Sequence, residues 1–524
     1  MDNPITSSVT TPINCHARGL LDRNLPRPDA KKIFIFCDGT GNKFQDQRGS
    51  PSANSNVVKL YTTLRVADNQ VAYYHPGVGT MGDPNTRWAI PRWWSMVKGL
   101  AFGAGFQATV LDAYRYLMEV YNDGDEIYIF GFSRGAYTAR AVAGLLHGYG
   151  LLCRGNEGHL LYAWNAFHDQ LKDTRKLATK KRTDLAAQSI SHDLAFAETY
   201  SRKVTIRFMG LWDTVSSVGW IYSPIRLLDM ARNPIVQVAR HAVSIDEKRA
   251  YYRDNLWGAP FNIHDNRWPE EFRAKGIQQD IAQVWFPGAH SDVGGSYKQE
   301  EAAPSNVTLE WMIGELQRNG ALLCQERIDM VLGTPSRVYC ADKIYTPPPE
   351  ANHCLHDQLK GPWWVLQGLP QQYYDKEDAK IKWRVPYGTP RTIPNGSIIH
   401  DSAVRRIRQP PGPEPKYDPP NLKQGELTQL TTQVGWTRAD LDKCWVYRRP
   451  EKGSTNDGLR LAKLAAGWVS FVIFFAVLFL AAWYLLGLAV FLARVIYVLL
   501  THTPKLKGLF SLGRKMFGRV GVGV

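Results

Sequence analysis

The chain has 524 residues, of which 44% are hydrophobic and 12% aromatic, and it carries a formal net charge of +15. This length allows one large catalytic domain with appendages, and the hydrophobic content is that of a globular protein. Seven cysteines without Cys-x-x-Cys spacing argue against a disulfide framework and a zinc site, and they predict reduced thiols in a cytosolic setting. Residues 1–27 are polar and lack an apolar core behind a basic start, so no secretory signal is expected.

The positive charge is concentrated in two places. Residues 501–524 contain five Lys or Arg residues and no acidic residue, and a second basic cluster lies at 175–182. Nucleic acid could bind such charge, but an anionic membrane surface fits better beside the apolar C-terminal segment described below. No nucleic-acid partner is expected.

The first part of the chain alternates strand and helix patterns. Residues 1–29 predict a flexible lead-in. After it we expect, in chain order, a strand at 31–36, a helix at 56–64, a strand at 70–75, a helix at 103–121, a strand at 125–130 and a helix at 136–146. Such alternation predicts an α/β fold with a mainly parallel sheet and helices on both faces.

A polar, basic, helical stretch at 151–200 interrupts this alternation, and we expect it to be an insertion or a cap over the site. Strands are predicted again at 204–211 and 281–286, and a helix at 309–323 closes a predicted catalytic domain of residues 30–334.

The most informative motif joins the strand at 125–130 to the helix at 136–146. It reads Gly131-Phe132-Ser133-Arg134-Gly135, a Gly-x-Ser-x-Gly sequence. A sharp strand-to-helix turn of this kind holds a serine in a strained backbone conformation with its hydroxyl exposed, and the flanking glycines give it room. Ser133 is therefore the candidate nucleophile, the alternative being a tight turn whose small residues serve packing alone.

A serine nucleophile needs a base, and the base needs an acid to orient it. Asp213 follows the strand at 204–211 and His290 follows the strand at 281–286, which gives the chain order Ser, Asp, His of α/β-hydrolases. Competing histidines are His356 and His400, in the irregular region that follows.

Three other acidic residues are alternatives to Asp213. Asp292 lies two residues from His290 and suits bracing of that loop. Asp246 and Glu247 lie in a stretch, 241–249, that looks helical and could form structural ion pairs.

The oxyanion of the reaction needs two N–H donors. The backbone amide of Arg134 is one candidate, and the loop Asp38-Gly39-Thr40 offers the second, although a Gly-rich turn organised by Asp38 is an alternative. Asp-Gly-Thr after an apolar strand also occurs in haloacid-dehalogenase phosphatases, whose nucleophilic Asp would stand where this chain has Phe36. The phosphatase reading therefore fails.

The C-terminal part differs in character. Residues 335–460 are rich in Trp, Tyr and Pro without clear periodicity, and we expect them to pack on the core. Residues 464–493 contain no charge, and with 495–500 they predict a membrane segment at 464–500, as one tilted helix or a hairpin. This predicts membrane localisation, contact with the bilayer through 464–500, and a catalytic domain facing the cytosol ahead of a basic tail at 501–524.

Four blocks together resemble a known α/β-hydrolase family. They are Cys37-Asp38-Gly39-Thr40-Gly41-Asn42, Gly131-Phe132-Ser133-Arg134-Gly135-Ala136, Leu211-Trp212-Asp213-Thr214-Val215 and Gly288-Ala289-His290-Ser291-Asp292-Val293-Gly294-Gly295. The family includes the catalytic domain of type VI secretion phospholipase effectors and many fungal proteins. The resemblance covers residues 31 to about 320 and implies a Ser-His-Asp lipid esterase with phospholipase A activity in its bacterial members. The C-terminal region and the insertion at 151–200 depart from it.

These observations predict a membrane-anchored serine hydrolase that cleaves acyl esters, with membrane lipid or another acyl ester as its substrate. Ser133, His290 and Asp213 would carry the reaction, and no metal or organic cofactor is required. The alternative is a non-catalytic, membrane-anchored binding module on a hydrolase fold.

Overall fold

The structure is a computed structural model, and it describes residues 30–39, 42, 53–77, 99–173, 195–215, 219–220, 223–224, 232–333, 354–361, 363–368, 370–375, 380–409, 416–423, 425–448, 469, 483 and 491–492. The chain divides into two compact units, residues 1–366 with 388–454, and residues 367–387 with 455–524. The second unit contains the hairpin β11 (Gln371–Asp375) and β12 (Lys380–Arg384).

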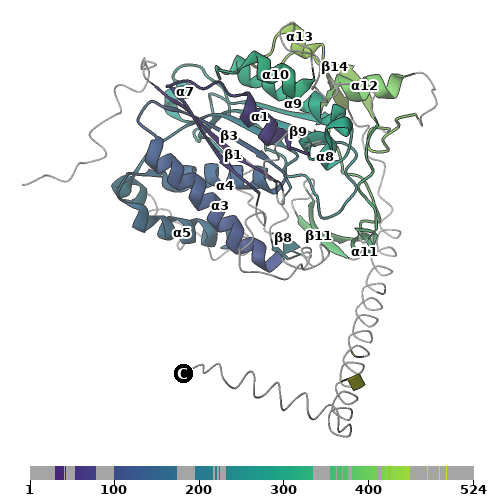
Figure 1. The fold of residues 1–524 in the computed structure, drawn as a ribbon, viewed down its shortest axis with the longest axis horizontal. Coiled ribbons are helices and arrows are strands. Elements are labelled where there is room, and N and C mark those ends of the chain that lie inside the picture. Colours follow the sequence, from purple (N-terminus) through teal and green to yellow (C-terminus); the bar gives the residue numbers. More distant parts are fainter. Residues whose placement is uncertain are drawn as a thin grey trace, which may run out of the picture. The chain divides into compact units, whose positions relative to one another are not determined.

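A nine-stranded sheet forms the centre of the first unit (Figure 1). Its order is β14-β15-β13-β10-β9-β6-β3-β1-β2. The strands are β1 (Lys32–Cys37), β2 (Gln70–His75), β3 (Glu126–Phe132), β6 (Ile206–Trp212), β9 (Val236–Ser244), β10 (Asp280–Phe286), β13 (Ile398–His400), β14 (Glu426–Gln429) and β15 (Cys444–Arg448). All neighbours from β2 to β13 pair in parallel, and β15 and β14 add an antiparallel edge. The predicted mainly parallel α/β sheet is therefore observed.

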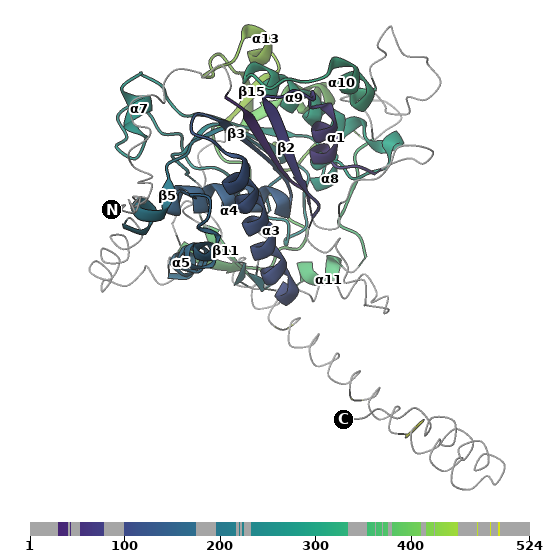
Figure 2. The same cartoon turned by 60° about the vertical axis from the view of Figure 1, so that its left-hand side comes forward.

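Helices cover both faces of this sheet (Figure 2). The helices are α1 (Asn56–Thr63), α3 (Gly99–Val120), α4 (Arg134–Tyr149), α5 (Leu160–Asp173), α7 (Glu270–Arg273), α8 (His290–Gly294), α9 (Ala303–Arg318), α10 (Gln325–Leu332), α11 (Trp363–Gln367), α12 (Asp401–Arg408) and α13 (Arg438–Leu441). One hydrophobic cluster lies between the sheet and α3, α4 and α5, and a second lies between the sheet and α1, α9 and α10. Because β1 and β3 are buried on both faces, their sequences read as nearly continuous apolar runs.

Strand β9 corrects the expectation of a helix at 241–249. It lies between β6 and β10, and the loop after it carries Asp246 and Glu247. Residues 241–244 belong to the strand because they continue its pairing with β10. The preceding residue, Arg240, is buried, 1% exposed, and is paired with Asp280 and Glu315 at 2.6 Å each. A charge inside a buried strand is tolerated only when such partners satisfy it.

Strand β4 (Leu151–Leu152), at the start of the insertion, pairs with β5 (Ser201–Arg202), directly after its end. The helix α5 of the insertion packs against α4. Residues 174–194, which the predicted cap includes, lie outside the described residues. In the region predicted to be irregular, β13, β14 and β15 extend the main sheet. The small ribbon of β7 (Gly219–Trp220) and β8 (Ser223–Pro224) follows β6.

The prediction of a transmembrane segment is wrong for the part of the chain that the structure describes. Helix α3, with 22 residues, has the length of a span but carries Asp112, Arg115 and Glu119, and no described helix combines sufficient length with sufficient apolarity to cross a bilayer. The segment 464–500 lies outside the described residues apart from four positions, as do 1–29 and 501–524 entirely. The fold class is corrected to a mixed α/β fold with a large, mostly parallel sheet.

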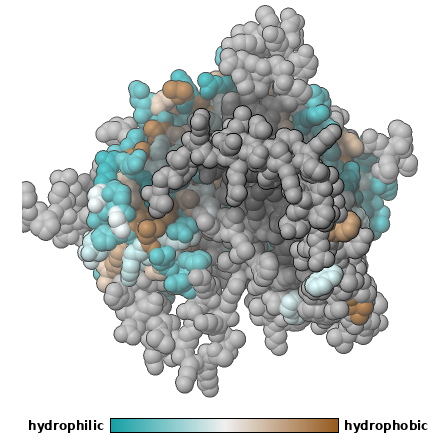
Figure 3. All heavy atoms as spheres, turned by 60° about the horizontal axis from the view of Figure 1, so that its bottom comes forward, coloured by the Kyte–Doolittle hydropathy of each residue, from teal (hydrophilic) through white to brown (hydrophobic). Residues whose placement is uncertain are grey.

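On the face seen in Figure 3, the described residues show hydrophilic and hydrophobic side chains interspersed. The residues considered next lie at the carboxyl ends of the parallel strands, where the loops after β1, β3, β6, β9 and β10 meet.

Candidate active site

Ser133 occupies the sharp turn between β3 and α4. Its backbone has φ 59° and ψ −124°, a conformation that is strained for any residue other than glycine. A Cβ atom on Gly131 would lie 2.5 Å from the carbonyl oxygen of Gly135, and one on Gly135 would lie 2.2 Å from that of Cys37. Both glycines are therefore required by close approach of the backbone, as the motif predicts.

The structure brings Ser133, His290 and Asp213 into one hydrogen-bonded chain. His290 Nε2 lies 2.8 Å from Ser133 Oγ, and His290 Nδ1 lies 2.5 Å from Asp213 Oδ2. A carboxylate only accepts hydrogen bonds, so Nδ1 carries the proton and Nε2 accepts from the serine hydroxyl. This is the tautomer that a general base requires.

Aromatic side chains shield this histidine from water. His290 is 4% exposed and Ser133 7% exposed. The rings of Phe132 and Tyr252 lie 4.7 and 4.8 Å from the imidazole, centre to centre. Desolvation lowers the pKa of His290 below its ordinary value, an effect that the hydrogen bond to Asp213 partly offsets, so the imidazole is neutral near pH 7.

Asp213 follows β6, and its backbone φ of 40° turns the side chain toward His290. Its Oδ1 accepts the N–H of Ser244, at the end of β9, at 2.9 Å. The next residue, Thr214, donates its N–H to Nε2 of His241 at 3.1 Å. Burial lowers the pKa of His241 to about 3, so this histidine is a neutral support of the loop.

Arg391 is a site residue that sequence reasoning missed. Its guanidinium donates to both carboxylate oxygens of Asp213, at 2.5 and 3.0 Å. Burial alone would raise the pKa of Asp213, but Arg391 and His290 together hold it well below its ordinary value. No sequence signal points to Arg391, which lies 178 residues from Asp213 in a region without clear periodicity.

Asp292 braces the loop that carries His290. Its Oδ2 accepts the backbone N–H of Ala289 at 2.9 Å, and its Oδ1 lies 2.6 Å from Nδ1 of His356. His356, a competitor for the role of base, is thus engaged with Asp292, and the hydrogen bond to that carboxylate raises its pKa. The structure brings His290, and not His356, to the serine hydroxyl.

The other two acids support the same loop. Glu247 accepts the backbone N–H of His290 at 3.2 Å and forms an ion pair with Arg249 at 2.8 Å. Asp246 accepts the N–H of Gly288 at 2.6 Å. Glu247 therefore forms the kind of structural ion pair that was expected, whereas Asp246 accepts hydrogen bonds, and both residues lie in a loop and not in a helix.

Of the three candidate oxyanion donors, the structure describes Arg134 and Gly39. Arg134 is the first residue of α4, so its N–H stands at the positive end of that helix. Gly39 lies beside Ser133, since a Cβ built on it would be 3.4 Å from the serine Cβ, but its N–H donates to Asp38 Oδ1 at 2.7 Å. This bond argues against Gly39 as the second donor. Thr40 lies outside the described residues.

Asp38 organises the loop after β1. Besides the N–H of Gly39, its carboxylate accepts the hydroxyls of Ser55 and Tyr74, both at 2.9 Å, and the amide of Asn42 at 3.4 Å. Burial raises the pKa of Asp38, and these donors partly oppose the rise. The alternative of a turn organised by Asp38 therefore describes this loop well.

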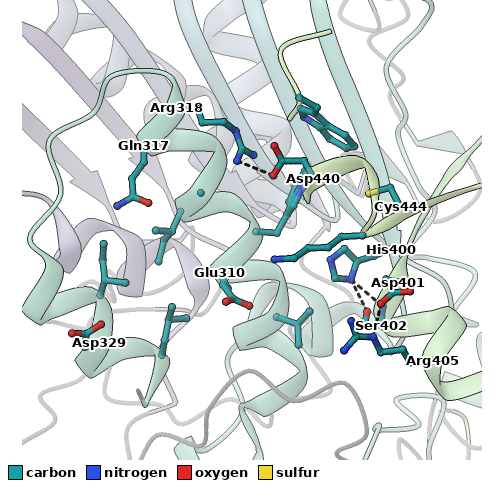
Figure 4. A pocket seen from close by; sticks show the side chains of 18 of the residues that line it. Glu310, Gln317, Arg318, Asp329, His400, Asp401, Ser402, Arg405, Asp440 and Cys444 are labelled. Atoms are coloured by element: carbon teal, nitrogen blue, oxygen red, sulfur yellow. Dashed lines mark hydrogen bonds and ion pairs between the residues drawn. The ribbon is translucent and has the colours of Figure 1, made fainter. Parts of the chain in front are cut away.

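The structure also contains a cavity of about 640 Å³ away from Ser133 (Figure 4). It lies along α9, beside α10, α12 and α13. His400, the second competing histidine, lines it and bonds Ser402, while Arg318 pairs with Asp440 across another part of the wall. Burial lowers the pKa of His400 to about 3.

Within the described ranges, no group of three or more His, Cys, Asp or Glu side chains could hold a metal ion.

Comparison with known proteins shows a family to which much of the chain is similar. Residues 31–315, more than half of the chain, match the catalytic domain of the Tle1-like phospholipase effectors of type VI secretion systems. The chain belongs to this family. The family is described as one of phospholipase effectors, and Ser133, Asp213 and His290 lie within the matched range.

Two individual proteins are also similar to the chain. Uncharacterized protein YEL023C of Saccharomyces cerevisiae is 34% identical over 233 residues, which are 43% of this chain and 32% of the yeast protein. The chain therefore aligns with about a third of that relative's length. A crystal structure of an uncharacterized protein from Pseudomonas aeruginosa aligns with 57% of this chain and 47% of that protein's chain, at 20% identity and a TM-score of 0.31.

Proposed function

We propose that the chain is a serine hydrolase that cleaves acyl esters of glycerophospholipids, with Ser133 as nucleophile, His290 as general base and acid, and Asp213 as the acid that orients the imidazole. The observation that carries this proposal is the hydrogen-bonded chain from Ser133 Oγ to His290 at 2.8 Å and from His290 to Asp213 at 2.5 Å. Membership of a phospholipase-like family supports the substrate class.

The first half of the reaction forms an acyl-enzyme. His290 Nε2 takes the proton of the Ser133 hydroxyl as Oγ attacks the ester carbonyl carbon, and the carbonyl electron pair moves to oxygen. The Arg134 amide at the start of α4 stabilises that oxyanion. When the oxyanion collapses, the C–O bond to the glycerol side breaks, and His290 returns its proton to the leaving alcohol.

The second half repeats these steps with water. His290 removes a proton from the water molecule, the hydroxide attacks the acyl carbon, and Ser133 leaves with the proton from His290. Asp213 stays ionised throughout and stabilises the imidazolium that forms twice in each turnover. The products are a fatty acid and a lysophospholipid.

The test measures hydrolysis of a short-chain phosphatidylcholine and of p-nitrophenyl butyrate by the full-length chain. We expect both to be cleaved, and Ser133→Ala to lower kcat on the order of 10⁶-fold. Ser397→Ala, a serine in the turn before β13, is the matched control and should retain wild-type activity.

Each other outcome overturns a stated part of the proposal. Cleavage of the butyrate alone would remove phospholipid as the substrate. Absence of turnover on both esters would favour the non-catalytic binding module, and equal activity of wild type and Ser133→Ala would remove Ser133 as nucleophile.

A further inference from the structure

The carboxylate of Asp213 is held by more than the imidazole it orients. Both of its oxygens bind Arg391, Oδ1 through Nη1 at 2.5 Å and Oδ2 through Nη2 at 3.0 Å. Oδ1 also accepts the N–H of Ser244. The Asp213 side chain is 0% exposed and that of Arg391 5% exposed, so water does not screen this pair. A two-point contact of a planar guanidinium fixes the plane of the carboxylate as well as its charge.

Every N–H of the Arg391 guanidinium has an acceptor. Besides its bonds to Asp213, Nη1 donates to the carbonyl oxygen of Ser244 at 3.4 Å, and Nε and Nη2 donate to the carbonyl oxygen of Tyr252 at 3.1 and 2.5 Å. A guanidinium has five N–H donors, and all five are used here. Tyr252 in turn presents its ring edge to His290. Arg391 therefore ties together two neighbours of the imidazole, its acid and its aromatic wall.

The backbone around Arg391 is itself anchored on the loop after β9. Asn421 donates to the carbonyl oxygens of Arg391 at 3.1 Å and of Ile245 at 2.8 Å. The Tyr417 hydroxyl donates to Asp246 at 2.8 Å. Residues 388–448, which follow the family-matched residues 31–315, thus reach the catalytic acid through several bonds.

We propose that Arg391 is a positioning residue of the catalytic centre, supplied from outside the family-matched domain, which orients the Asp213 carboxylate and balances its charge. This inference rests on the proposed function, because it assigns a task to Arg391 in the reaction of Ser133.

The positive charge of Arg391 should affect the pH dependence of the reaction, which a purely structural role would not. The groups facing the His290–Asp213 pair are Arg391, Glu247, Arg249, Asp254 and the neutral His241. Removing the cation Arg391 raises the proton affinity of the coupled His290–Asp213 pair, whichever of the two residues binds the proton. Only the deprotonated pair is active as a base. Loss of the Arg391 charge therefore moves the acid limb of kcat/KM to higher pH.

The experiment compares Arg391→Met, Arg391→Lys and Arg438→Met in the full-length chain by kcat and kcat/KM against pH, with thermal unfolding of each. Arg438 is a matched control because it pairs with Asp442 in the same C-terminal region, but its side chain is 76% exposed. We expect Arg391→Met to lower kcat about 100-fold through misplaced geometry. We expect its acid limb to move upward by about one pH unit.

Arg391→Lys keeps the charge and loses the two-point contact, and it guards against failure of the Met variant to fold. We expect it to leave the acid limb in place and to lower kcat about tenfold. A folded Arg391→Met with an unmoved limb would overturn the charge-balancing role. An Arg391→Lys with wild-type kcat would overturn the orienting role.

Reaction of Ser133 with a fluorophosphonate distinguishes failure of the role proposed for Arg391 from failure of the proposed function. If wild type is labelled at Ser133 and the Arg391 variants keep the wild-type pH profile and kcat, the inference fails and the proposed function stands. If wild type is not labelled at Ser133, the proposed function fails, and the inference fails with it.

Discussion

Residues 31–315 and residues 388–448 contribute to one sheet and one site in different ways. The first region supplies the parallel strands from β2 to β10 and the three groups of the hydrogen-bonded chain, Ser133, Asp213 and His290. The second supplies three strands at the far edge and one cation, Arg391, which binds the acid. The reacting groups thus come from the region that the family shares, and the group that compensates the buried acid comes from the region beyond it.

A site that contains all three reacting groups still needs a group that compensates the charge of its buried carboxylate. A carboxylate with no exposure cannot rely on water for compensation, so its environment must supply the opposite charge. In this chain that charge comes from a region that lies outside the family-matched residues.

The largest effect should come from the first region. Asp213→Asn cannot hold the proton of His290 on Nδ1, so we expect kcat to fall about 10⁴-fold. Asp112→Asn, on the exposed side of α3, is the control and should have no effect. Rates of ester hydrolysis at saturating substrate check this. If Asp213→Asn stayed within tenfold of wild type, Asp213 would not be the acid that orients His290.

The next effect is on stability, and it concerns the turn between β3 and α4 in the first region. A Cβ on Gly135 would lie 2.2 Å from Cys37 O and 2.4 Å from Asp38 O, so Gly135→Ala should destabilise the fold by about 3 kcal/mol. Gly148 lies in the same helix with nothing within 4 Å of a built Cβ, and Gly148→Ala should stabilise by about 0.5–1 kcal/mol. Urea unfolding measures both, and equal effects of the two substitutions would contradict the close approach.

A smaller effect should come from the contact between the regions at Tyr417. Burial raises the pKa of Asp246 to about 6, above its ordinary 3.8, so protonation favours the folded state and that stability is lost as pH rises from about 4 to 6. The Tyr417 hydroxyl bonds the ionised form, and Tyr417→Phe should cost about 1 kcal/mol at pH 8 and less at pH 5. Tyr162→Phe, at an exposed tyrosine of α5, is the control for chemical denaturation. A pH-independent loss would show that the hydroxyl does not serve Asp246.

The smallest effect should come from His356, which lies between the two regions. The hydrogen bond to Asp292 raises the pKa of His356 above its ordinary 6.5. Its stabilising contribution is therefore fully present below pH 6.5 and is lost as pH rises through the folded-state value. The Tm difference between wild type and His356→Gln should be larger at pH 6 than at pH 9. The reverse order would mean that the pair with Asp292 does not form in solution.

Most of the first region could be predicted because its strands are apolar runs that end in polar residues. Strands β1, β3, β6 and β10 end at Asp38, Ser133, Asp213 and the His290 loop, and parallel strands bring such ends together. Residues 241–244 form part of β9 instead of the expected helix because they pair with β10 in the folded chain, a contact that no local pattern reveals.

The second region could not be predicted in the same way. Strands β13, β14 and β15 have three to five residues each, too few for periodicity to develop. Arg391 is recognisable only by the carboxylate it meets in the folded chain. The membrane segment was inferred from composition alone, which states how apolar a stretch is and not what structure it adopts.

The most direct measurement is the site of covalent modification by a fluorophosphonate, read by peptide mass spectrometry on the full-length chain. We expect one adduct, on the peptide that contains Ser133, formed far more slowly in His290→Ala. An adduct on a different residue, or formation at an unchanged rate without the imidazole, would contradict this expectation.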